Sequence, residues 1–179
     1  VQTLVHKIER EEERILAHLT AGVRDVRQPL THNQGILARL DLRQAIARLT
    51  VDLDGIVPEL AMEPSLALRD ARHPLLVAAE RDKPEAPTVV PVDLRLPEEC
   101  HTLIISGPNT GGKTVALKTA GLLVLMVRAG LPIPCAPGSR LFPFAPVMAD
   151  IGDEQSIEQS LSTFSGHLLR LRNILEKAE

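Results

Sequence analysis

The chain has 179 residues, which is enough for one medium-sized domain or for parts of two. Its residues are 44% hydrophobic and 24% charged, values that exclude an intrinsically disordered chain. A formal net charge of −3 without a basic cluster, and three Phe with no Trp or Tyr, argue against a surface that follows DNA phosphates or stacks on bases.

The cysteines and the apolar runs indicate the cellular compartment. Cys100 and Cys135 are not closely spaced and have no His or Cys cluster beside them, so we expect two reduced thiols. The amino terminus does not have the pattern of a signal peptide. The longest apolar run, Ala120 to Val127, is too short to cross a membrane. The sequence therefore predicts a soluble, cytoplasmic chain with no membrane partner.

The first part of the chain, residues 1–60, has the pattern of helices. Ile8, Ile15 and Leu19 recur near one face of a first helix. Pro29 interrupts this pattern, and a second periodic segment runs from Ile36 to Leu49. Two helices joined by a short turn are the simplest arrangement. We place the boundary with the second domain, residues 61–179, near residues 55 to 65.

The second part alternates between strand and helix patterns. Prolines at short intervals between Pro58 and Pro97 exclude long helices there. The predicted elements are strands over 88–92 and 102–106, a helix over 113–128 ended by Gly130, a strand over 144–148 and a final helix over 162–177. This alternation predicts an α/β fold with a largely parallel sheet.

A phosphate-binding motif lies between the predicted strand over 102–106 and the helix that follows it. Residues 107–114 match G-x-x-x-x-G-K-[ST] at every fixed position. The glycines allow backbone N–H groups to converge on phosphate oxygens, and the helix adds the partial positive charge of its amino terminus. Lys113 and Thr114 are the predicted catalytic residues: the lysine binds the β- and γ-phosphates of a nucleoside triphosphate, and the threonine hydroxyl binds Mg²⁺. The candidate nucleotide-binding residues in this region are Gly107, Pro108, Asn109, Thr110, Gly111, Gly112, Lys113, Thr114 and Val115.

Three stretches together resemble the MutS family of DNA-processing ATPases. The first is the loop itself, with Pro108-Asn109 inside it, and the second is Ala-Arg-His-Pro-Leu over 71–75. The third runs from Ala149 to Ser165 and contains Ser-Thr-Phe near its end. The amino-acid sequence of the third stretch is similar to that of the second bacterial branch of the family. The resemblance covers nearly the whole chain.

The resemblance implies a partial P-loop NTPase of the ABC type, preceded by helical core or lever segments over residues 1–60. It implies ATP or ADP and Mg²⁺ as ligands, and a homodimer in which two ATPase domains face each other. In such a dimer Ser162 and Thr163 would contact the γ-phosphate bound to the partner. From the residues alone, a plain cap for their own helix is an equal alternative.

For the whole protein, the resemblance implies branched or recombining DNA as a partner, bound through parts outside this chain. It also implies collided ribosomes as a second partner and a carboxy-terminal Smr nuclease domain. The family comparison puts the strand with the metal-binding Asp and the general-base Glu beyond Glu179. We therefore expect this chain alone to turn over ATP near background, and we read Asp150 and Asp153 as loop residues near the Mg²⁺ and water site.

Two other functions remain open from the sequence. One is an unrelated P-loop kinase that uses Asp150 as its Mg²⁺ ligand, although no arginine-rich lid follows the loop. The other is a module that dimerises in response to nucleotide without turnover. His73, His101 and His167 have no spacing typical of metal ligands, and we expect structural or surface roles for them.

Overall fold

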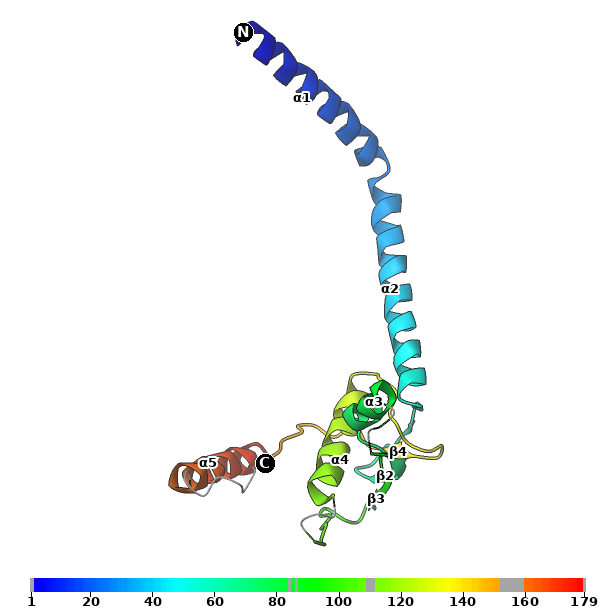
Figure 1. Ribbon diagram of the computed structural model, residues 1–179, viewed down its shortest axis with the longest axis vertical. Helices are drawn as coiled ribbons and strands as arrows, with labels where there is room; N and C mark the ends of the chain where they lie inside the picture. The colour runs from blue at the N-terminus through cyan, green and yellow to red at the C-terminus, as the bar shows by residue number, and fades with distance from the viewer. Residues whose placement is uncertain (1, 84, 86, 109–111, 152–159, 179) are drawn as a thin grey trace. The chain divides into compact units, whose positions relative to one another are not determined.

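The computed structural model of the protein describes residues 2–83, 85, 87–108, 112–151 and 160–178 (Figure 1). The chain divides into two units, residues 1–45 and residues 46–179. Within the described residues, no helix has an apolar stretch long enough to cross a membrane. The candidate site lies in the second unit.

The first fifty residues form the helices α1 (Gln2–Asp25) and α2 (Arg27–Asp52). The second helix begins at Arg27, well before the predicted start at Ile36. Pro29 does not interrupt it, because Pro29 lies in the first turn, where backbone N–H groups have no helical acceptor. The predicted apolar face of α1 is exposed to solvent: Ile8 and Leu19 keep 56% and 60% of their surface.

The second unit contains a mixed four-stranded sheet in the order β1-β4-β2-β3. Its strands are β1 (Glu59–Leu60), β2 (Leu66–Ala71), β3 (Val92–Leu96) and β4 (Arg140–Leu141). Only β1 and β4 pair in parallel, whereas β2 is antiparallel to both β3 and β4. The prediction of a largely parallel sheet is therefore wrong for the described part of the chain.

The strands predicted over 88–92, 102–106 and 144–148 are not formed. Pro91 and Pro146 lack the N–H group that a sheet ladder needs, so the first of these segments becomes a strand only from Val92 onward. In the segment over 102–106, the side chain of Ile104 is 84% exposed. A β-strand is defined by its hydrogen bonds to a neighbouring strand, and no described strand pairs with this segment.

The helices of the second unit include α3 (Pro74–Asp82), α4 (Lys113–Arg128) and α5 (Ser160–Ala178). The predictions of α4 and of a final helix are confirmed. Gly130, with φ of 74°, closes α4 as predicted: its N–H donates to Val127 O, and the N–H of Leu131 donates to Met126 O. These two bonds form a Schellman motif, which satisfies the last carbonyl groups of the helix.

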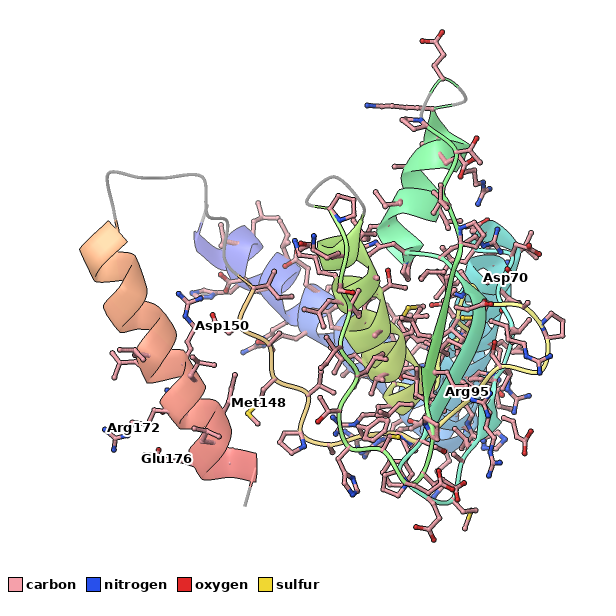
Figure 2. All side chains as sticks on the ribbon, turned by 90° about the horizontal axis from the view of Figure 1, so that it is seen from below. Asp70, Arg95, Met148, Asp150, Arg172 and Glu176 are labelled. Atoms are coloured by element: carbon pink, nitrogen blue, oxygen red, sulfur yellow. The ribbon has the colours of Figure 1, made fainter. Side chains whose placement is uncertain are left out.

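The core of the second unit lies between α4 and the sheet, which Figure 2 shows side by side. Leu123 of α4 is fully buried, together with Leu68 of β2 and Leu141 of β4. Asp70 and Arg95 (Figure 2) lie on the neighbouring strands β2 and β3, where the N–H of Asp70 donates to Asp93 Oδ1. The packing of α4 on this sheet fixes the position of its amino terminus, where the phosphate-binding motif lies.

Both cysteines are free, in agreement with the expected reduced thiols. Cys100 is exposed, whereas Cys135 is buried in the core. Burial raises the pKa of the Cys135 thiol to about 11, and hydrogen bonding to Ser139 opposes this shift. The folded protein therefore holds Cys135 as the neutral thiol at pH values where an exposed cysteine ionises.

The first prediction concerns the core. Leu123→Ala removes a fully buried side chain, so we expect it to lower the free energy of unfolding by about 2 to 5 kcal/mol in urea denaturation. Leu117→Ala is the matched control, because it makes the same change on the same helix at a side chain that is 52% exposed. Equal losses for the two variants would contradict the packing described here.

The second prediction concerns pH. Above pH 9 the unfolded state releases the Cys135 proton while the folded state retains it, so stability should fall as the pH rises from 9 towards 11. We expect this contribution to reach about 2 kcal/mol. Unfolding measured at pH 8 and pH 10.5 should show a smaller loss in Cys135→Ala than in the wild type. Parallel losses in both proteins would show that Cys135 does not contribute to the pH dependence.

Candidate functional site

The phosphate-binding motif lies at the amino terminus of α4. Gly112 precedes the helix in the left-handed conformation, with φ of 76°, and Gly107 has φ of 144°. Both values favour glycine, because a Cβ atom would strain the backbone there. The motif residues Asn109, Thr110 and Gly111 lie outside the described residues. The geometry at both ends of the loop fits a turn that brings the backbone onto the helix axis.

Lys113 lies in the first turn of α4, and its side chain folds back over the loop. Its Nζ donates hydrogen bonds to Gly107 O, at 2.6 Å, and to Pro108 O, at 2.7 Å. These bonds place the positive charge of Lys113 beside Gly107 and Pro108, at the amino terminus of α4. A lysine in this position can shift from the carbonyl oxygens to phosphate oxygens that enter the loop.

A cavity of about 620 Å³ lies beside the loop, between α3, α4 and the segment 87–92. Gly112 and Lys113 line it at the phosphate-binding motif. Apolar groups line most of the remainder, and no Asp or Glu is among the described residues of the lining. The apolar lining residues include Ala71, Leu76, Ala79, Val89, Val90, Ile105, Val115 and Ala116. The volume is typical of pockets that bind small ligands.

His73 contributes a polar group to the cavity wall. It is the residue that precedes α3, and its Nδ1 is buried without a hydrogen-bond partner among the described residues. Burial lowers the pKa of the His73 imidazole, and the nearby charge of Lys118 lowers it further. The imidazole is therefore neutral at pH 7 and can both donate and accept one hydrogen bond.

Thr114 is the predicted Mg²⁺ ligand, and it is exposed in the first turn of α4. Among the described residues, no group of three or more His, Cys, Asp or Glu could hold a metal ion on its own.

The other predicted site residues are placed only in part. Ser162 and Thr163 lie in the first turn of α5, and their side chains are outside the described residues. Asp150 lies in a loop, where its Oδ1 is 3.3 Å from Arg170 Nη1 of α5 (Figure 2). Asp153 is outside the described residues. The roles predicted for these four residues stay predictions.

The sequence reading missed the cavity. Two of its walls, α3 and the segment 87–92, are separated from the loop in the chain. The Ala-Arg-His-Pro-Leu stretch was noted as a family marker, yet it also starts α3, because Pro74 takes the first position of that helix. The sequence signal that could have indicated the cavity was a short helix begun by Pro74, followed by the apolar segment 87–92.

The chain is similar to known proteins along almost all of its length. Residues 103–179 match the family MutS domain V. The chain is 52% identical, over 94% of its length, to the Endonuclease MutS2 of Pelotomaculum thermopropionicum, of which it covers 20%. It is 45% identical over its full length to the Endonuclease MutS2 of Acetivibrio thermocellus, of which it covers 22%. The chain thus spans about a fifth of the length of these curated relatives.

The third prediction tests the left-handed turn. Gly112→Ala places a Cβ atom at φ of 76°, and we expect it to lower the free energy of unfolding by about 1 to 2 kcal/mol. Gly121→Ala, inside the same helix, is the matched control and should raise stability by about 0.5 to 1 kcal/mol, because its Cβ would meet only Val147 at 4.0 Å. Effects of the same sign at both sites would rule out this backbone geometry.

Proposed function

Because the chain belongs to the MutS family, as its identity to the MutS2 relatives shows, we propose that it binds ATP or ADP with Mg²⁺ in the manner of a P-loop NTPase. The phosphates occupy the loop from Gly107 to Thr114, and the base and ribose occupy the adjoining cavity. The observation that carries this proposal is the continuity of the two: Gly112 and Lys113 line the cavity and also belong to the phosphate-binding motif.

The loop and the cavity offer different groups to the phosphates and to the base of the nucleotide. Phosphate oxygens accept hydrogen bonds from Lys113 and from the N–H groups at the start of α4. The adenine ring is flat and largely apolar, so it gains by leaving water for a wall of Val, Leu and Ala side chains. The neutral His73 supplies a hydrogen-bonding group in an otherwise apolar wall.

Mg²⁺ binds through the hydroxyl of Thr114 and through the phosphates, and when bound it neutralises charge that develops on the phosphoryl group. Hydrolysis also requires a general base within hydrogen-bond reach of the attacking water. None of the described residues that line the cavity is a carboxylate that could act as this base. We also propose that this chain on its own binds nucleotide and hydrolyses it near background.

In the whole protein, the proposed role is the nucleotide-binding part of an ATPase that works as a homodimer. Ser162 and Thr163, in the first turn of α5, would contact the γ-phosphate bound to the partner subunit. The helices α1 and α2 would serve as lever segments. The relatives are named endonucleases, and we propose that the whole protein acts on branched or recombining DNA, with ribosomes as a second partner.

Membership in the MutS family argues against the alternative hypothesis, in which the chain is an unrelated P-loop kinase. The hypothesis of a module that dimerises in response to nucleotide without turnover agrees with the same loop and cavity. It differs from the ATPase hypothesis in one respect, which is whether the assembled dimer releases phosphate. Sedimentation with and without a non-hydrolysable triphosphate tests dimerisation, and phosphate release tests turnover.

The fourth prediction tests nucleotide binding. Lys113→Ala removes the charge over the loop and should weaken ATP binding at least tenfold, as measured by calorimetry or by displacement of a fluorescent nucleotide. Lys118→Ala is the matched control, because it removes a lysine from the same helix that does not line the cavity. We expect its ATP affinity to stay within about twofold of the wild type.

If both lysine variants bind ATP as well as the wild type does, the loop is not the nucleotide site. Phosphate release by the chain alone is measured on the same preparations. Steady release that disappears in Lys113→Ala would contradict the proposal that the chain alone hydrolyses ATP only near background.

A further inference from the structure

Helix α3 forms one wall of the cavity, yet its own core contacts are limited. Leu76, Ala79 and the preceding His73 line the cavity, while Pro74 and Val77 are buried on the side of the core. Leu75 keeps 69% of its surface exposed. A helix of nine residues is too short to be stable by itself, so its position depends on its core contacts through Pro74 and Val77 and on the contacts at its ends.

Both ends of α3 are tied to the carboxyl end of α2 by ion pairs. Arg81, in the last turn of α3, pairs with Asp52, the last residue of α2. Arg72, two residues before α3, places Nη2 at 3.0 Å from Asp54 Oδ2 and 3.4 Å from Asp54 O. Two separate pairs thus join the same two segments, one at each end of the cavity wall.

A further hydrogen bond connects α3 to another wall of the cavity. Glu80, next to Arg81 on α3, accepts a hydrogen bond of 3.1 Å from the N–H of Val89. Val89 lies in the segment that forms another wall of the cavity. The end of α2, the helix α3 and this segment are therefore connected by polar contacts, none of which involves the phosphate-binding loop.

We propose that Asp52 and Asp54 are positioning residues for the base of the nucleotide: through Arg81 and Arg72 they fix α3 and the cavity wall that it forms. The inference rests on the proposed nucleotide function and specifies which residues shape its base-binding half. It separates the site into two parts, since the loop holds phosphates by its own geometry and the cavity wall depends on the two ion pairs.

An acidic residue at the carboxyl end of a helix is unfavourable to the helix dipole, and the last turn of α2 contains no basic residue. Replacing Asp52 by Asn therefore relieves a local repulsion within α2 while it removes the pair with Arg81. A loss of ATP affinity in this variant would come from the cavity wall rather than from unwinding of α2.

The test compares two ligands in the protein with Asp52→Asn and Asp54→Asn combined. We expect the Kd for ATP to rise about three- to tenfold, the range for two exposed ion pairs, while the Kd for inorganic tripolyphosphate stays within about twofold. Glu11→Gln is the matched control, because it breaks the ion pair with Arg14 on α1, far from α3 in the chain. It should change neither affinity.

A charge exchange keeps the proposal testable if the double variant is poorly folded. Asp52→Arg combined with Arg81→Asp rebuilds the pair with reversed signs and should recover ATP affinity that Asp52→Arg alone loses. If Lys113→Ala still weakens ATP binding at least tenfold, unchanged ATP affinity in all the Asp and Arg variants, or equal losses for ATP and tripolyphosphate, would overturn the inference. If the wild type does not bind ATP through Lys113, the proposed function fails instead.

Discussion

The packing of α4 against the mixed sheet is the constraint on which the rest of the site depends. Leu123 and Val124 of α4 are buried against Leu68 and Leu141 of the sheet, so the helix cannot slide without opening the core. The amino terminus of the same helix presents Gly112 and Lys113 to the loop and to the cavity. A phosphate site built on the end of a firmly packed helix keeps its N–H groups in place before any ligand arrives.

Features that depend on residues close together in the chain were predictable from the sequence, whereas features that depend on distant residues were not. Helix α4 and its end were predicted correctly, because helical periodicity and the terminal Gly130 are local signals. The strands over 88–92, 102–106 and 144–148 were not, because pairing is a property of partners distant in the chain and the prolines weighed against it. The family was visible from short motifs, whereas the cavity required α3, the segment 87–92 and α4 to be brought together in space.

The ion pairs around α3 show why composition says little about a local site. The chain has a net charge of −3, which disfavours binding of a polyanion in general. The carboxylates of Asp52 and Asp54 are paired with arginines, and that of Glu80 is occupied by the N–H of Val89. These contacts neutralise or engage acidic groups on the elements that hold the cavity wall.

The same contacts explain how an acidic chain can present a cationic site. Lys113 and the amino terminus of α4 act over a few ångströms, while the remaining charges are spread over the surface and screened by salt within about 10 Å. Among the described residues, Lys113 and the amino terminus of α4 set the local field at the loop, and none of those that line the cavity is a carboxylate that would oppose them. Under the proposed function, the apolar cavity selects a nucleotide over a simple phosphate, and α3 forms one wall of that cavity.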